Sequence, residues 1–253
     1  AWTSGAAGVE SVWGNADPWL WGLREVATCD GVFGSREEVG AAAEPAAGPT
    51  ARAWRDAAAE TGAWVVGGFP ERDGGRRYNS ALVVSPDGIE GVYRKIHRWN
   101  EERKWFDPGT EVPAFETPFG RLGVQVCNDV WFPELTLTQA RDGVDLVALP
   151  TNWVPEPDGR PGGWTTGVHQ AIASANANRV FVACADRAGT ERGVTFEGQS
   201  VVVGPGGMPL AGPLPDSGAH TATAECDLSQ AQDKSPTDRD HVLDDRRPDV
   251  YDT

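Results

Sequence analysis

Cysteine is scarce in this sequence and widely spaced. The 253-residue chain has only four: Cys29, Cys127, Cys184 and Cys226. No two of them form a CxxC or CxxH pair, which argues against a disulfide framework and against a zinc site. We therefore expect a reduced, cytoplasmic protein without a metal, in which each cysteine is a small buried apolar residue unless its surroundings activate it.

Long apolar runs and positive charge are also lacking. No stretch approaches the ~20 apolar residues that a membrane-spanning helix requires. The chain has 22 Lys and Arg against 37 Asp and Glu, a net charge of −15, so nucleic acid and anionic membranes are not expected as partners. The opening AWTSGAAGVESVWG has neither the basic nor the apolar part of a signal peptide. It also lacks an initiator methionine, so we expect the native start to be missing.

No internal repeat and no low-complexity linker divides the chain, so we expect one domain over residues 1–253. A chain of this length buries roughly 70–75 % of its unfolded surface, which is enough for a core without disulfides. Residues 1–24 fit the rest poorly. Residues 231–253 form a highly charged tail that is expected to lie over the surface or against a partner subunit.

Short valine-rich runs alternate with helical segments. Several runs are apolar at consecutive positions, as in sheets that are covered on both faces, and this predicts an α/β fold. The predicted strands are 63–69, 79–86, 121–129, 145–150, 179–186 and 200–205. The predicted helices are 49–62, with Thr50 as its N-cap and Gly62 just past its end, 132–143 and 167–178. Residues 85–88 are predicted to form the turn of a hairpin.

The stretch GRLGVQVCNDVWFPE places Cys127 where a predicted buried strand ends. In layered α/β folds the strand ends are where a rigid scaffold meets open loops, a common location for reactive groups. A thiol reacts as the thiolate and needs a base or a cation close by. On these residues alone, an inert buried cysteine remains the commoner outcome.

A second polar stretch, GVYRKIHRWNEERKWFDPG, joins a predicted strand edge to an aromatic loop. Basic residues in such a stretch usually form a solvated face, which suits Arg94, Arg98 and Arg103. Lys95 is distinguished only by the motifs around it. YRKIH, FDPG, GRLGV..CND.WFPE and ALPTNW follow in this order, and together they resemble the nitrilase superfamily of carbon–nitrogen hydrolases.

The resemblance extends from about Leu23 to Tyr251 and is densest between Trp64 and Trp153. It implies a four-layer α-β-β-α sandwich, a homodimer or larger homo-oligomer, and catalysis without a cofactor. The first strand of the family has no clear counterpart before residue 25.

The catalytic residues of this family are two glutamates, a lysine and a cysteine. The resemblance assigns Cys127 as the nucleophile and Lys95 as the lysine. Glu102 matches the second glutamate by its offset from FDPG, with Glu101 as the alternative. The best counterpart of the first glutamate is Glu25, in GLREVATCDGVFGSREEV.

These assignments imply a mechanism through a cysteine thioester. Glu25 takes the thiol proton, and the Lys95 ammonium favours the thiolate. Lys95 and the backbone N–H of Asn128 stabilise the oxyanion, and losing one such donor typically costs about 100- to 1000-fold in rate. Glu25 then protonates the leaving amine and activates the water that hydrolyses the thioester on Cys127. Glu102 positions the substrate or Lys95.

In relatives the PTNW segment lines the substrate pocket, which points to Asn152 and Trp153 as substrate-binding residues. Trp131, Trp99 and Trp105 are candidates for the same wall, although each tryptophan has at least an even chance of packing only. An aromatic wall would favour an apolar or ring-bearing acyl group.

The triplet Cys127-Asn128-Asp129 is closer to the amidase pattern of the family than to the Cys-Trp-Glu of true nitrilases. The expected substrate is therefore a small amide or carbamoyl compound, with a nitrile as the alternative. A papain-type pairing of Cys127 with His97 lacks the local signature, so His97 is expected to be structural.

A third possibility is a catalytically impaired relative that acts as a binding protein. Its support is the absent opening strand and Arg24, which stands where the family usually has proline. A damaged start would leave a sheet edge unpaired and Glu25 loosely held.

Overall fold

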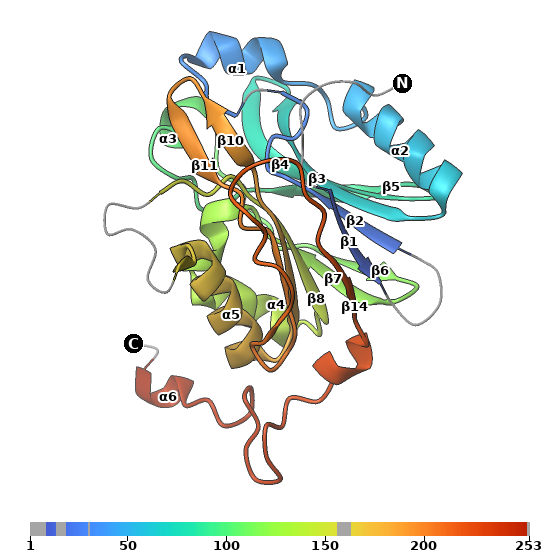
Figure 1. Ribbon diagram of the computed structural model, residues 1–253, viewed down its shortest axis with the longest axis vertical. Helices are drawn as coiled ribbons and strands as arrows, with labels where there is room; N and C mark the ends of the chain where they lie inside the picture. Colours follow the sequence, from blue (N-terminus) through green and yellow to red (C-terminus); the bar gives the residue numbers. More distant parts are fainter. Residues whose placement is uncertain (1–8, 14–18, 30, 156–162, 252–253) are drawn as a thin grey trace.

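Two six-stranded sheets lie face to face, with helices on their outer faces (Figure 1). The computed structural model describes residues 9–13, 19–29, 31–155 and 163–251. The remaining parts of the 1–24 segment and of the charged tail lie outside these residues. None of the helices in the described ranges has the length and apolar character to cross a membrane.

The first sheet has the strand order β14-β1-β2-β3-β4-β5. Pairs β1–β14 and β2–β3 are parallel, and β3, β4 and β5 form an antiparallel meander. The bounds are β1 (Val9–Trp13), β2 (Trp19–Leu23), β3 (Trp64–Asp73), β4 (Arg76–Ser85), β5 (Gly88–Arg94) and β14 (Thr223–Glu225), with helices α1 (Arg36–Ala42) and α2 (Pro49–Thr61) on this half of the molecule.

The second sheet has the order β13-β12-β9-β8-β7-β6, with β7, β8 and β9 parallel. Its strands are β6 (Ala114–Thr117), β7 (Gly120–Val124), β8 (Leu146–Pro150), β9 (Phe181–Ala185), β12 (Val201–Val203) and β13 (Pro209–Ala211). Helices α4 (Pro133–Arg141) and α5 (Thr166–Asn178) pack on it. The other elements are α3 (Glu102–Trp105), the 3-10 helices η1 (Cys127–Trp131) and η3 (Leu228–Ala231), the hairpin β10 (Ala188–Glu191) and β11 (Val194–Glu197), and α6 (Pro248–Tyr251).

The continuous apolar runs are explained by the layers. Along β3, Trp64 and Val66 enter the core between the two sheets, whereas Val65 packs against Trp54 of α2. Strands β8 and β9 behave alike: Phe181 faces the other sheet, and its neighbours on either side face the helices. Because side chains alternate along a strand, a strand that is covered on both faces must be apolar at every position.

An opening strand is present, which corrects the expectation that the family's first strand is missing. β2 ends two residues before Glu25 and pairs with β3 through Leu20↔Trp64 and Gly22↔Val66. Its sequence, WLWGL, has neither alternation nor β-branched residues, so its strand character comes from pairing with a distant segment.

Two local predictions also need correction. The N-cap of α2 is Gly48, with Pro49 as the first helical residue, and the Thr50 hydroxyl instead donates to Glu44. Proline at the first helical position shifts the helix start, since its missing N–H is not needed there. Gly62 does end this helix in the left-handed conformation, with φ +72°. The strand predicted over 121–129 stops at Val124.

Candidate active site

Three charged side chains meet at Lys95, one of them from a segment 70 residues earlier in the chain. The Lys95 Nζ donates to Glu25 Oε1 at 2.7 Å and to Glu102 Oε1 at 2.9 Å. Asn79 Nδ2 donates to the same two oxygens, at 2.6 Å and 2.9 Å. Lys95 is 1 % exposed and Glu25 3 %. A buried ammonium thus lies between two carboxylates, with an amide holding the carboxylates in place.

The backbone fixes Lys95 and Glu102 from both sides. Lys95 follows β5 directly; its N–H donates to the Asn79 carbonyl at 2.8 Å, and its carbonyl accepts from Gly109 N–H at 2.9 Å. Gly109 belongs to the FDPG motif, and a side chain there would begin 2.0 Å from the Arg94 carbonyl. Glu102 starts α3, and its Oε2 accepts the Trp99 N–H at 2.7 Å.

Glu25 lies in a tight turn after β2. Val26 has φ +48°, and a Cβ on Gly68 would lie 2.4 Å from the Val26 nitrogen, so the two backbones are in close contact. Arg24 holds this turn: its Nη1 donates to the carbonyls of Glu25 and Val26 at 3.2 Å and 3.1 Å, and its Nη2 to that of Cys29 at 3.4 Å. The arginine that replaces the usual proline therefore supplies an alternative restraint.

Cys127 opens η1 just after β7, with φ +47°. Asp129, fully buried, ties this helix to the segment that carries Lys95. One Asp129 oxygen accepts from Tyr93 Oη at 2.7 Å and Val126 N–H at 2.9 Å. The other accepts the His97 N–H at 3.0 Å and contacts His97 Nδ1 at 2.8 Å. His97 is thus bound to the buried carboxylate, in agreement with a structural role.

Burial and neighbouring charges together shift the pKa values in this cluster. It raises the pKa of the Cys127 thiol well above its usual range; the Glu25 carboxylate adds to the shift, and the Lys95 ammonium opposes it without cancelling it. Burial also lowers the pKa of Lys95, but Glu102 and Glu25 outweigh it and the net shift is upward. Burial raises the pKa of Glu102. Lys95 therefore favours the thiolate, as expected, but burial and the Glu25 carboxylate outweigh it in the net shift of the Cys127 pKa.

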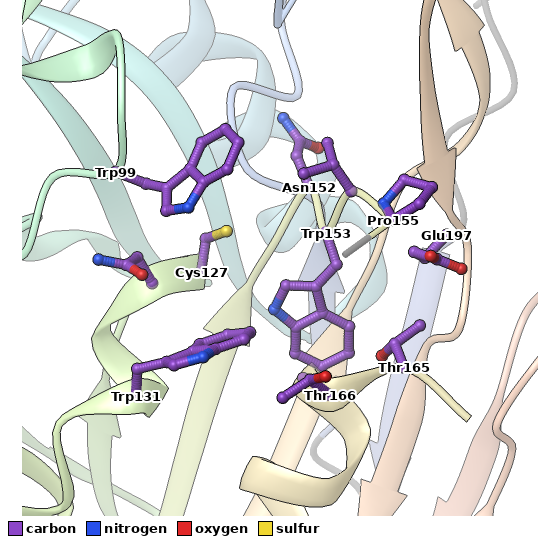
Figure 2. A pocket seen from close by; sticks show the side chains of 12 residues that line it. Trp99, Cys127, Trp131, Asn152, Trp153, Pro155, Thr165, Thr166 and Glu197 are labelled. Atoms are coloured by element: carbon purple, nitrogen blue, oxygen red, sulfur yellow. The ribbon is translucent and has the colours of Figure 1, made fainter. Parts of the chain in front are cut away.

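Two cavities meet at Cys127. The tryptophan cavity, about 300 Å³, is lined by Asn128, Trp131, Trp153, Pro155, Thr165, Thr166, Gly167 and Glu197. The carboxylate cavity, about 280 Å³, is lined by Glu25, Lys95, Glu102, Trp105 and a set of apolar side chains. Both are lined by Trp99, Cys127, Asn152 and Val154. Figure 2 shows the Cys127 sulfur between the rings of Trp99 and Trp131, with Trp153 across from it.

All eight residues predicted for the site line these two cavities. Glu25, Lys95 and Glu102 line the carboxylate cavity, Cys127 and Asn152 line both, and Asn128, Trp131 and Trp153 line the tryptophan cavity. Trp153 also packs, since a Cβ on Gly167 would lie 2.3 Å from its indole ring. Glu101, the alternative to Glu102, also lines the carboxylate cavity, but it is exposed and pairs with Lys104.

The loop after β8 is held by a carboxylate that the sequence analysis did not identify. Asp186, at the end of β9, accepts the N–H groups of Trp153, Arg187 and Gln199 at 2.8, 2.9 and 3.0 Å. Burial raises its pKa to about 7 despite these three donors. The signal was its position at the end of a buried parallel strand, next in the sheet to the strand before Asn152.

Among the described residues, no group of three or more His, Cys, Asp or Glu side chains is arranged to hold a metal ion.

Comparison with known proteins places these motifs in context. A family model described as carbon-nitrogen hydrolase matches residues 19–234. A protein named nitrilase from Pyrococcus abyssi is 35 % identical, over 87 % of this chain and 80 % of its own length. An N-carbamoylputrescine amidase from Arabidopsis thaliana is 32 % identical, over 80 % of this chain and 72 % of its own.

Among solved structures, the NitN amidase from Nesterenkonia sp. AN1 superposes with a TM-score of 0.69 and 26 % identity, covering 90 % of this chain and 83 % of the amidase. In a mutant of that amidase, acrylamide has added to the active-site cysteine.

Proposed function

The chain belongs to the carbon–nitrogen hydrolase family, and on that premise we propose that it hydrolyses a small amide or carbamoyl compound to an acid and ammonia or an amine. Cys127 is the nucleophile, Glu25 the general base and acid, and Lys95 the catalytic cation. The observation that carries the proposal is the buried Lys95 ammonium, held at 2.7 Å from the buried Glu25 carboxylate and at 2.9 Å from the half-buried Glu102 carboxylate, in a cavity that Cys127 also lines.

The attack step follows from the protonation states. Because burial raises the pKa of the Cys127 thiol, a base is needed, and Glu25 accepts the thiol proton as the sulfur attacks the amide carbon. The developing oxyanion is stabilised by the Lys95 ammonium and by the N–H of Asn128. Asn128 is the second residue of η1, and the opening N–H groups of a helix lack intrahelical acceptors. Donors aimed at a developing charge are usually a large part of catalysis.

The intermediate then collapses. Glu25 passes its proton to the amide nitrogen, the C–N bond breaks, and the acyl group remains on Cys127 as a thioester. Water, deprotonated by the same Glu25, attacks the thioester and releases the acid and the thiol. Glu102 keeps Lys95 charged through its 2.9 Å ion pair, and Asn79 keeps the two carboxylates apart.

Asn152, Trp153 and Trp131 bind the substrate in this proposal, from the walls of the tryptophan cavity. A nitrile is the second candidate substrate, favoured by the relative from Pyrococcus abyssi that is named a nitrilase. The amide is preferred because the Nesterenkonia protein, which covers 90 % of this chain, is an amidase, and because Asn128-Asp129 follows Cys127.

We further propose that the chain is a single domain that works in the cytoplasm as a homodimer or larger homo-oligomer, without a cofactor. Support for assembly comes from exposed apolar side chains at the edge of the second sheet and in the tail, among them Met208, just before β13, at 69 % exposure and Val250 at 62 %.

The test is an assay of ammonia and amine release from a panel of amides, carbamoyl compounds and nitriles. Wild type is expected to act on amides, and Cys127→Ala, Lys95→Met and Glu25→Gln are each expected to lose at least 100-fold in kcat. Activity on nitriles alone would replace the amidase proposal with the nitrilase one. No turnover of any compound, together with alkylation of Cys127 by iodoacetamide no faster than of Cys184, would identify an impaired relative.

A further inference from the structure

The two cavities at Cys127 differ in the chemistry of their walls. The three ionisable residues of the proposed mechanism other than the thiol line only the carboxylate cavity, whereas the tryptophan cavity contains none of them. The sulfur therefore lies at a junction, and the residues of the proposed proton transfer lie on one side of it only. The carboxylate that lines the tryptophan cavity, Glu197, has no role in the proposed mechanism. Since both cavities open on the same sulfur, an acyl carbon attached to it has room for a substituent on each side.

This asymmetry determines which half of an amide lies in which cavity, if Glu25 is the acid of the proposed function. The amide nitrogen must come within hydrogen-bond reach of Glu25 to receive its proton, so it lies on the carboxylate side. The oxyanion is held by Lys95 at the same junction. The remaining substituent of the carbon, the acyl chain, then extends into the tryptophan cavity between Trp131 and Trp153.

The carboxylate cavity is larger than an ammonia leaving group needs. At about 280 Å³ it approaches the size of small-ligand sites. Away from the charged cluster its walls are mainly apolar and aromatic, with Asn100, Glu101 and Asn152 as the polar members. The apolar members include Val32, Phe33, Trp105, Phe106, Val194 and Phe196. Phe33 and Phe106 meet edge to face at 5.9 Å. Such walls bind an apolar group and have little affinity for ammonia or water.

We propose that the enzyme cleaves N-substituted amides, with an alkyl or aryl-alkyl group on the departing nitrogen held in the carboxylate cavity. This inference rests on the proposed function and specifies its substrate class. In R–CO–NH–R′ the sulfur of Cys127 bonds to the carbonyl carbon, the C–N bond breaks, and the thiol proton reaches the nitrogen through Glu25. R′NH₂ leaves, and water converts the thioester to R–COOH and regenerates the thiol.

The test uses matched substrates that share one acyl group: phenylacetamide with N-benzylphenylacetamide, and hexanamide with N-benzylhexanamide. Ammonia and benzylamine are quantified separately, and kcat/KM is compared within each pair. We expect at least one benzyl amide to be cleaved no less efficiently than its primary amide, because the benzyl group gains the apolar wall.

Two substitutions in β11, Val194→Trp and Thr195→Trp, distinguish an effect on the carboxylate cavity from an effect on the strand itself. Val194 lines the carboxylate cavity from β11, whereas Thr195, next to it, is exposed and lines neither cavity. Val194→Trp fills the space for R′ and is expected to lower kcat/KM for the benzyl amide at least 10-fold, with less than a 3-fold effect on the primary amide. Thr195→Trp, the matched control, is expected to leave kcat/KM unchanged for both the benzyl amide and the primary amide. If Val194→Trp does not fold, Val194→Phe takes its place.

Failure of this inference differs from failure of the proposed function. Cleavage of the primary amides with the benzyl amides below 1 % of their efficiency would overturn the inference and leave the amidase intact. An equal loss for both substrates in Val194→Trp would overturn it as well. Absence of any amide cleavage would remove the proposed function itself.

Discussion

Replacement of Asp129 by asparagine tests how the nucleophile loop is held. The carboxylate is fully buried, and its two oxygens have four polar contacts, two on each oxygen. Asparagine keeps only one acceptor oxygen. In either orientation of the amide, its NH₂ group faces a backbone N–H, from Val126 or from His97, so at least one buried donor loses its acceptor.

The cost can be estimated from those contacts. A hydrogen bond to a charged group contributes about 1.5–3 kcal/mol, and a buried donor left without a partner costs about 1–3 kcal/mol. We therefore expect Asp129→Asn to lower the free energy of unfolding by about 3 kcal/mol. At roughly 2–4 °C per kcal/mol for a chain of this size, the melting temperature would fall by about 6–12 °C. Because the same contacts aim Cys127, its alkylation by iodoacetamide should also change.

Urea unfolding followed by tryptophan fluorescence measures the loss, with Asp56→Asn as the matched control. Asp56 is 72 % exposed in its side chain and pairs with exposed Arg55, a type of ion pair that contributes about 0–1 kcal/mol. If Asp129→Asn were as stable as Asp56→Asn within about 0.5 kcal/mol, the reasoning about the loop would be refuted.

Three further predictions follow from single contacts. Burial raises the pKa of Asp186 from 3.8 to about 7, so the folded state binds a proton that the unfolded state has lost. The free energy of unfolding should therefore fall as the pH rises from about 4 to about 7, by at most ~4 kcal/mol. Urea unfolding at pH 5 and pH 8 should show this fall in wild type and a smaller one in Asp186→Asn. Arg24→Met removes three hydrogen bonds from the Glu25 turn and should lower kcat about 10-fold or more with little change in KM, since small misplacements cost up to about 100-fold. The control Arg52→Met loses one exposed hydrogen bond to a loop carbonyl and should leave kcat unchanged. Equal kcat values in the two variants would exclude a positioning role for Arg24. Gly167→Ala places a Cβ 2.3 Å from the indole of Trp153 and should lower the free energy of unfolding by about 1–3 kcal/mol and raise KM. An unchanged melting temperature and KM would show that the indole ring can move aside without cost.

Much of the fold could be predicted because its layers are encoded in local pattern. Strands β3, β4, β8 and β9 are apolar at consecutive positions because they are covered on both faces, and the helices between them have recognisable ends. β2 could not be predicted, since WLWGL becomes a strand only by pairing with β3. The early end of β7 was missed because Cys127 adopts φ +47° within a run that reads as strand.

In the candidate site too, the residues in local motifs could be predicted and those that depend on distant contacts could not. Glu25, Lys95, Glu102 and Cys127 could be located by their motifs, and the structure brings all four to one cavity. The residues that hold them could not, because Asn79 contacts partners 54 and 23 residues away. The size of the burial effect could not be predicted for a related reason: the burial that raises the thiol pKa depends on everything packed around it.

The central claim, that an acyl group is carried on Cys127, is tested most directly by mass spectrometry of protein that is acid-quenched during turnover of a cleaved amide. We predict a mass increase equal to the acyl group on the peptide that contains Cys127, absent from Cys127→Ala. Turnover by Cys127→Ala at the wild-type rate, or an acyl group found on Cys29 instead, would contradict the account.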